Sequence, residues 1–563
     1  MQLSYYGGRY SIQRVLAFDE YTRRTSLARV VFVCFVTPVP MVALVFGQEL
    51  VPLQELSEGW SANYGMWLRA AVMVGIVTHA LLVQGMYLID NFVVSVRQML
   101  QLYVIMPMIM VGLSMIMSAY LVFPIPFYML LAPPPFYVLL VVILRVVVGA
   151  RAFRQMLAHR VQVGRCVRFV FAQTSTVFIF PFYEILFSAA QGTKYQFPVI
   201  LLLPVIKVAL KNLVLHYAKA LEDMAPVEVI FTADFFNAIY VATCMHSSTS
   251  AAAISAIIVT DLLQTITTLY GLQRRTASIL SRLRQAVDAT KDSDNILTMM
   301  CSLCRDLEFV KTQSHQGIRK LSCLPLQISD VSKRLLDSLD EILPEPGAES
   351  LNTHEGSAII RGPRVSNIPT QNTPSLSSIM ASKHPSTIYP DGTNPPIPHK
   401  APLSKKTPTS KHSASKNPTI LLESLQTVFT TECILITAYL ETFMPLFYSS
   451  YMMLMVQLPN VKYHLEMEGV TRENVVSSVV PLVIFGLLQF LSFAMSALLI
   501  RRNCGMEALY QLAFVLETQR SLIQCKMMLW MVITLCFRVT HFGVDFKLEF
   551  IRLGFPKIWY PHG

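Results

Sequence analysis

The stretch VVSSVVPLVIFGLLQFLSFAMSALLI, residues 475–500, decides the fold class. It contains no charged side chain, and Arg501 and Arg502 follow it directly. As a helix, such a run is long enough to cross the hydrocarbon core of a bilayer, which is about 30 Å thick. The sequence therefore predicts an all-α, integral membrane protein.

Nine other apolar runs with few charges lie on the N-terminal side of this stretch. They cover about 30–46, 66–89, 102–122, 127–149, 169–190, 198–217, 230–247, 252–272 and 425–458. The composition agrees, because only 14% of the residues are charged, against about 25% in a typical soluble domain. We predict a polytopic protein with about ten transmembrane helices. Residues 527–542 form a marginal eleventh span, since Arg538 and His541 interrupt it.

The spans fall into two groups separated by a long polar segment. We predict a cytoplasmic N-terminus over 1–29, an eight-span bundle over 30–272, cytoplasmic amphipathic helices over 273–343, a disordered Pro/Ser/Thr/Lys-rich linker over 344–420, a two- or three-span bundle over 421–543 and a tail over 544–563. Apolar residues at helical spacing indicate the amphipathic helices. The linker has too few large apolar residues to offset the entropy of the chain.

The distribution of arginine predicts the orientation of the spans. Residues 151–168 hold five arginines and no acid, whereas residues 49–58 hold three glutamates and no lysine or arginine. Because cytoplasmic loops carry the excess of positive charge, we place the N-terminus, residues 151–168 and the long polar segment in the cytoplasm. The net charge of +11 is interpreted as this orientation signal, and we expect no nucleic-acid partner.

Ionisable residues inside the spans are the main candidates for a functional site. Each costs roughly 2.5 to 3.5 kcal/mol at the bilayer centre, so each should be paired or face a polar path. By depth, those near the middle of their spans are His79, Lys207, Asp261 and Glu441. Secondary candidates are Arg145, Lys211, Asp234 and Glu432 nearer the cytoplasm, and Glu184 toward the outer side.

Two interpretations of these charges stay open. They form a charged midplane site of the kind that secondary transporters build for ions and substrates, or they are structural ion pairs that hold helices together. Transport or small-solute permeation requires Lys207, Asp261 and Glu441 to converge. The alternative function is a membrane receptor or scaffold that acts through its cytoplasmic segment. The sequence does not identify the substrate.

Prolines inside the spans add a second kind of candidate. They are Pro38, Pro40, Pro107, the run Pro133-Pro134-Pro135, Pro181, Pro204 and Pro445. Each removes a helical hydrogen bond and frees a backbone carbonyl, which neighbours or water must then satisfy. Such breaks line transport sites and also occur as simple kinks. The triple proline is the strongest signal, since it cannot sit within a regular helix.

The sequence contains none of the common enzyme motifs and only a weak candidate for a metal site. The sequence has no Gly-x-x-x-x-Gly-Lys-Ser/Thr phosphate loop, no His-Glu-x-x-His and no Gly-x-Ser-x-Gly, so we predict neither an enzyme nor a cofactor. Cys301, Cys304, His315 and Cys323 could offer soft ligands to zinc. However, Cys301 and Cys304 fall on an apolar helix face, so we interpret them as buried thiols. We predict no metal site, and reduced cysteines throughout.

The linker carries a basic, acid-free run over residues 400–416. On the cytoplasmic side it could touch anionic lipid, at about 1 kcal/mol per lysine near the surface, or bind a cytoplasmic partner. We predict that phosphorylation of Thr407, which follows Lys405 and Lys406, weakens the lipid contact by adding about −1.5 to −2 charge.

Several short motifs occur together in both halves of the chain. They include SLARV (26–30), TPVP (37–40), FPIPF (123–127), DFFNAIY (234–240), YQLAFVLE (510–517) and HFGVD (541–545). This combination resembles a large family of multi-pass membrane proteins encoded in oomycete genomes, for which no activity is assigned. The resemblance implies the membrane architecture and implies nothing about chemistry.

Overall fold

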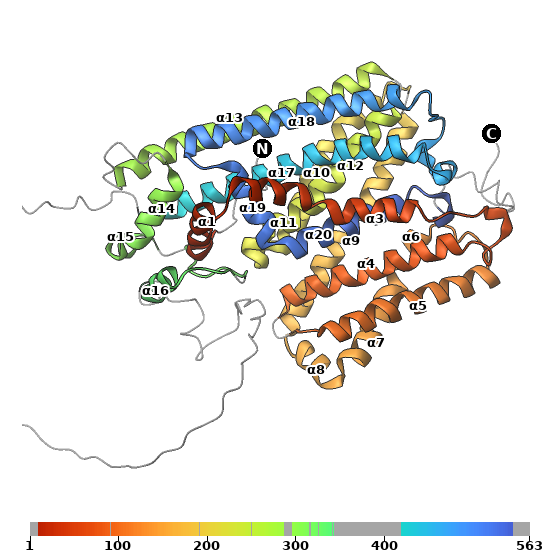
Figure 1. Ribbon diagram of the computed structural model, residues 1–563, viewed down its shortest axis with the longest axis horizontal. Coiled ribbons are helices and arrows are strands. Elements are labelled where there is room, and N and C mark those ends of the chain that lie inside the picture. Colours follow the sequence, from red (N-terminus) through yellow and green to blue (C-terminus); the bar gives the residue numbers. More distant parts are fainter. Residues whose placement is uncertain are drawn as a thin grey trace, which may run out of the picture. The chain divides into compact units, whose positions relative to one another are not determined.

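The apolar runs form long helices in the computed structural model of the protein (Figure 1). The structure describes residues 10–89, 92–190, 192–248, 250–286, 295–314, 317–324, 326–339, 342 and 418–543. In these ranges nine helices are long and apolar enough to cross a membrane, and two helices that meet at 119° can make a tenth. The prediction of an all-α, polytopic membrane protein with about ten spans is confirmed.

The first eight predicted spans all correspond to helices. These are α2 (Leu27–Val36) with α3 (Val39–Glu49), α4 (Tyr64–Leu88), α5 (Val96–Tyr120), α7 (Pro133–Val148) with α8 (Ala150–Ala158), α9 (Arg160–Ala190), α10 (Gln196–Ala218), α11 (Ala225–Val229) through the π-helical turn η4 (Ile230–Asp234) to α12 (Phe235–Ser247), and α13 (Ala251–Ala286). Side chains fix several starts. The Ser95 hydroxyl, for example, accepts a hydrogen bond from the backbone N–H of Gln98, and Oε1 of Gln98 accepts one from the backbone N–H of Ser95.

The later part of the chain adds four more helices. They are α17 (Ile420–Met455), α18 (Val475–Cys504), α19 (Ala508–Thr518) and α20 (Arg520–Cys536). The turn between α17 and α18 marks one end of the bundle, which we call the loop end. The opposite end, which we call the α14 end, carries α1 (Ile12–Arg24), α14 (Ile296–Arg305) and α15 (Leu307–Thr312) (Figure 1).

Helices α19 and α20 carry the chain back through the bundle. Asn503, in the last turn of α18, bonds Thr276 of α13, whereas Val539, just after α20, pairs with His464 at the loop end. The chain therefore passes from one end of the bundle to the other between these residues. Helix α20 is shorter than the nine spans and is buried by its neighbours.

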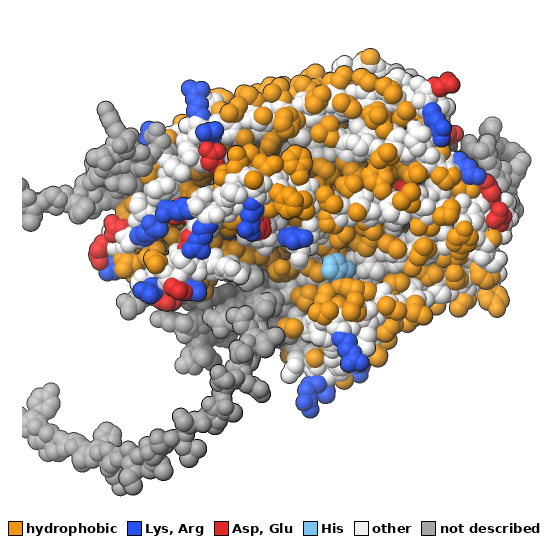
Figure 2. Space-filling view, in the orientation of Figure 1, with side chains coloured by type: hydrophobic (Ala, Val, Ile, Leu, Met, Phe, Trp, Pro, Cys, Tyr) orange, Lys and Arg blue, Asp and Glu red, His pale blue; other side chains and the backbone are white. Residues whose placement is uncertain are grey.

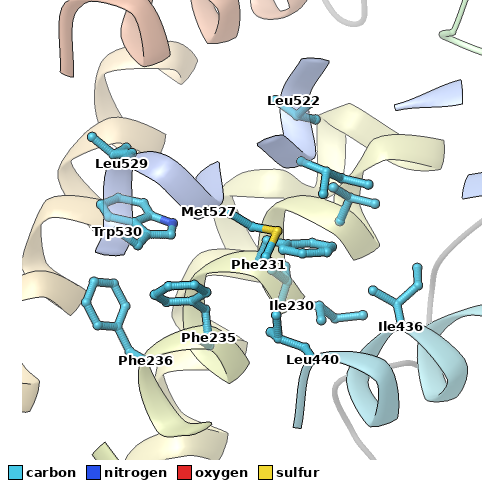
Figure 3. Packing of buried hydrophobic residues seen from close by; sticks show 14 of the residues in the cluster. Ile230, Phe231, Phe235, Phe236, Ile436, Leu440, Leu522, Met527, Leu529 and Trp530 are labelled. Carbon is cyan, nitrogen blue, oxygen red and sulfur yellow. The ribbon is translucent and has the colours of Figure 1, made fainter. Parts of the chain in front are cut away.

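The span formed by α11, η4 and α12 is the centre of the packing, since other helices bury it completely. Helices α17 and α20 both pack on it. Figure 3 shows the side chains at these contacts: Met527 and Trp530 of α20, Phe231, Phe235 and Phe236 of the central span, and Ile436 and Leu440 of α17. Trp530 and Phe236 have ring centroids 5.3 Å apart, so aromatic packing fixes α20 against the central span.

The polar segment forms short helices at the α14 end. Helix α14 buries its apolar side chains and both of its cysteines, as the helical spacing predicts, and packs on α1, α13 and α17. Helix α16 (Asp330–Ser338) contacts α1. Residues 343–417, with the candidates Lys405, Lys406 and Thr407, lie outside the described residues, as does the tail 544–563.

Three local features differ from the sequence-based expectations. The prolines from Pro133 to Pro135 begin α7 instead of breaking a helix, because the first-turn N–H groups have no helical partner to lose. The predicted loop over 151–168 is helical, in α8 and the start of α9. Helix α13 does not end near residue 272 but continues to Ala286, where Arg282 pairs with Glu423 of α17 at 2.6 Å.

The flank of the bundle between its two ends is apolar. Figure 2 shows hydrophobic side chains spread over this face, with charged ones gathered mainly toward the ends. Strongly exposed apolar side chains include Leu100, Val104 and Met108 of α5, Val259, Leu263 and Ile266 of α13, and Ile484, Leu487 and Leu491 of α18. An exposed apolar surface of this extent is unfavourable in water and suits contact with lipid.

The predicted orientation can be tested with two engineered thiols. Glu55 lies at the loop end and Arg151 lies in α8, and both side chains are exposed. The ten native cysteines are free and buried or half-buried, so their background reaction should be low. An impermeant thiol reagent added to intact cells should label Glu55→Cys and leave Arg151→Cys unlabelled until the membrane is permeabilised. The reverse pattern would invert the topology.

Candidate functional site

Ionisable side chains converge on Lys207, which lies at the middle of α10 (Gln196–Ala218). Its Nζ atom is 2.6 Å from Oε1 of Glu441 in α17 and 3.5 Å from Oδ1 of Asp234 in η4. Lys211, one turn further along α10, places its Nζ atom 2.7 Å from the same Asp234 oxygen. The i, i+4 spacing puts both lysines on one face of α10, which is turned toward η4 and α17.

Asp234 is the carboxylate that joins the two lysines. It is 0% exposed and ends the π-helical turn η4, inside the completely buried span. Thr437 of α17 donates a hydrogen bond to its other oxygen at 3.3 Å. A π-turn interrupts regular helix geometry and is common at functional sites. Here it ends at the residue that both lysines contact.

Asp261 of α13 lies beside this group without pairing directly with a lysine. It is close enough to interact electrostatically with Lys207 and Glu441, and it accepts a hydrogen bond from the Gln489 side chain of α18. It makes no ion pair with a described residue. Lys207 therefore has Glu441 and Asp234 as its direct partners.

The convergence required for a midplane site is thus present in the structure. Lys207, Asp261 and Glu441 come together, and the secondary candidates Lys211 and Asp234 join them. We call these five residues the charge cluster. With every group ionised, two lysines face three carboxylates, which leaves one uncompensated negative charge. The four ion-paired groups balance, so the surplus charge lies on Asp261.

The other predicted site residues lie elsewhere. His79 of α4 contacts the Tyr103 hydroxyl of α5 through Nδ1 at 2.5 Å. Arg145 is exposed in the last turn of α7. Glu184 of α9 is within electrostatic range of Arg538 and Glu466, near the loop end. None of the three contacts the charge cluster.

Glu432 belongs to a separate buried pair that the sequence did not indicate. Arg14 of α1 is 1% exposed and places Nη2 2.6 Å from Oε1 of Glu432. Its Nη1 atom donates to the carbonyl oxygen of Asp223 at 2.9 Å. Arg14 lies in the segment 1–29, which we predicted to be a cytoplasmic N-terminus. The apolar face of α1, with Val15, Leu16 and Phe18 buried, is the signal that could have placed it inside.

A second unpredicted network links α20 to the N-terminal helices. The Nζ atom of Lys526 is 2.8 Å from Glu228, which accepts a hydrogen bond at 2.9 Å from Gln173, and Gln84 donates to Gln173 at 3.1 Å. Gln84 and Gln173 also line an apolar cavity between α4, α5, α7, α9 and α20. This network pairs a buried lysine with a carboxylate, and none of its members belongs to the charge cluster.

The cysteine motif does not assemble a metal centre in the described part of the chain. Cys301 and Cys304 are buried and free in α14, and burial raises the pKa of Cys304 to about 12. The Cys323 thiol donates to the carbonyl oxygen of Leu221 at 3.2 Å, and His315 lies outside the described residues. No group of three or more His, Cys, Asp or Glu residues in the described ranges is placed to hold a metal ion.

Comparison with protein-family models, with curated proteins and with solved structures finds no match to this chain.

Proposed function

We propose that the protein is a secondary transporter or small-solute permeation protein whose central site is the charge cluster, and that it moves its solute without chemical change. The observation that carries this proposal is the meeting of Lys207, Lys211, Asp234, Asp261 and Glu441 from four different spans in the interior of a membrane bundle. Charged residues there are costly and mark substrate or ion pathways.

Two further features favour a working site over a purely structural set of ion pairs. Three of the spans that supply the cluster are irregular near it. Pro204 in α10 and Pro445 in α17 each leave one helical carbonyl without its N–H partner, and η4 is a π-turn. Transporters use backbone polar groups that are freed in this way to hold ions and substrates. The surplus carboxylate also leaves one charge for a ligand to neutralise.

Solute uptake by proteoliposomes that contain the purified protein tests the proposal. A solute panel should be screened with and without pH and sodium gradients, against empty liposomes. We expect uptake of at least one solute to depend on a gradient and to be lost in a variant whose charge cluster is altered but whose fold is intact. Uptake that is unaffected by such a variant would remove the proposed site.

A receptor or scaffold is the second candidate function, and the docking of α16 on α1 favours it. Glu20 of α1 accepts hydrogen bonds from the backbone and hydroxyl of Ser329 and from the hydroxyl of Ser332, all at 2.6 to 3.2 Å. Burial by itself would raise the pKa of Glu20, but these bonds lower it below its usual value. A modification or partner that breaks this contact would release α16. Such a release is a device for signalling, and it does not require solute flux.

A further inference from the structure

A small cavity adjoins the charge cluster between α9, α10, α12 and α13. The space open to the centre of a water-sized sphere is about 30 Å³. This is enough for one water molecule or one dehydrated monovalent cation. Its polar lining comes from Asn237 of α12 and from Thr260, Asp261 and Gln264 of α13. Asp261 therefore belongs both to the charge cluster and to this cavity.

Asn237 shows that the cavity is built for a polar guest. Its side chain is 5% exposed and makes no hydrogen bond with any described residue, although it lines the cavity. A buried amide without a partner costs about 1–3 kcal/mol, so a native protein retains one where something else satisfies it. Gln264, which is half-buried, lies on the same cavity wall.

Helix α10 contributes a freed backbone oxygen. Pro204 lies within α10 and has no N–H, so the carbonyl of Ile200 loses the hydrogen bond it would accept in a regular helix. Ile200 and Pro204 both line the cavity. The donor set available there is thus one carboxylate, two amide oxygens, one hydroxyl and one backbone carbonyl, which are all oxygen ligands.

The number of carboxylates in the lining indicates the charge of the ion that the cavity suits. Asp261 is the one carboxylate in the lining, and Gln489 donates to its Oδ2 atom, which leaves Oδ1 for a ligand. Calcium and magnesium sites usually combine several carboxylates, whereas a single positive charge neutralises the surplus carboxylate of the charge cluster. A proton would need none of the neutral oxygens around Asp261.

We propose that this cavity binds a hard monovalent cation of the size of sodium, coordinated by Asp261, Asn237, Thr260, Gln264 and the freed carbonyl of Ile200. The ion's role as the coupling ion rests on the proposed transport function. Its binding does not, because binding is measured without any flux. The cation brings the charge cluster to neutrality and satisfies the Asn237 amide that the protein leaves unpaired.

Equilibrium binding of radioactive sodium to the purified full-length protein in detergent is the direct test. We expect saturable binding that lithium competes for better than potassium, because the cavity is small. Asp261→Asn keeps the shape of the side chain and removes its charge, and it should abolish binding. Asn237→Leu keeps every charge and breaks no hydrogen bond within the protein. It should fold normally and weaken the affinity at least tenfold.

Glu184→Gln is the matched control, since Glu184 lies on α9 but does not line the cavity, and its loss should leave sodium binding unchanged. Absence of saturable binding in the wild type, or binding that survives both Asp261→Asn and Asn237→Leu, would overturn the inference. Uptake whose pH dependence changes in Asp261→Asn, without any sodium binding, would also overturn the inference and would identify a proton as the ion bound at Asp261. Sodium binding without uptake of any solute would keep the cation site and reject the transport function.

Discussion

Replacing Lys207 alone by methionine is expected to destabilise the protein by about 3–5 kcal/mol. The change leaves the half-buried Glu441 and the buried Asp234 with Lys211 as the remaining nearby cation of the cluster. A carboxylate that loses its partner in a low-dielectric interior keeps its full desolvation cost. Thermal unfolding of the purified protein in detergent should show a much lower midpoint, together with reduced expression.

The double variant Lys207→Met with Glu441→Leu separates stability from function. It removes the 2.6 Å pair as a pair and leaves Lys211 with Asp234. Because a buried pair replaced by apolar groups of similar size is often neutral, most of the lost stability should return. Uptake should remain abolished. Full uptake by this variant would show that the pair only holds α10 against α17 and would favour the receptor or scaffold.

An exposed ion pair offers the matched control for both variants. Lys462 and Glu55 pair at the loop end with side chains that are 56% and 53% exposed. Lys462→Met, alone or with Glu55→Leu, should change the unfolding midpoint far less than Lys207→Met does, because water screens such pairs. A comparable loss at this surface pair would mean that the effect at Lys207 is not specific to burial.

The second large effect is expected at Arg14. Arg14→Met leaves Glu432 without the cation that lies 2.6 Å away, and leaves the carbonyl of Asp223 without its donor, in a site where both charged side chains are 1% exposed. We expect a loss of about 3–5 kcal/mol in the free energy of unfolding. Arg14→Lys should recover only part of it, since one ammonium cannot reproduce the guanidinium fork.

Arg23 on the same helix provides the comparison for Arg14. Its side chain is 58% exposed in an i, i+4 pair with Asp19, and Arg23→Met should cost about 0.5 kcal/mol or less. Thermal unfolding of both variants measures the difference. Equal stability of Arg14→Met and Arg23→Met would contradict the buried anchor of α1 on α17.

Hydropathy alone was sufficient to predict the long apolar helices, because the preference of a segment for a bilayer depends mainly on its own composition. A backbone in hydrocarbon must satisfy its own hydrogen bonds, so an apolar run of sufficient length becomes a helix whatever its neighbours are. Residues 475–500 illustrate this, since α18 covers them entirely. Helix α20 shows where hydropathy is not sufficient. This short helix contains the buried Lys526, and it lies inside the bundle because it packs on α3, α4 and η4.

The orientation, the regulatory role of Thr407, the contact with anionic lipid and the resemblance to the oomycete membrane family stay predictions. They concern the surroundings of the protein or residues outside the described ranges. The depth estimates, by contrast, could be compared with the structure. Lys207 and Glu441 were assigned to one level from run lengths, and their side chains meet at 2.6 Å.

The sequence by itself determined which residues enter the membrane, since that depends on local composition. Only the tertiary structure decided which of them meet. Glu441 follows Lys207 by 234 residues and Glu432 follows Arg14 by 418, and an apolar span gives no periodic signal for the face it turns to its neighbours. The cavity that Asp261 lines could not be predicted from the sequence, because it is the space left between α9, α10, α12 and α13. Its existence depends on the packing of all four helices together.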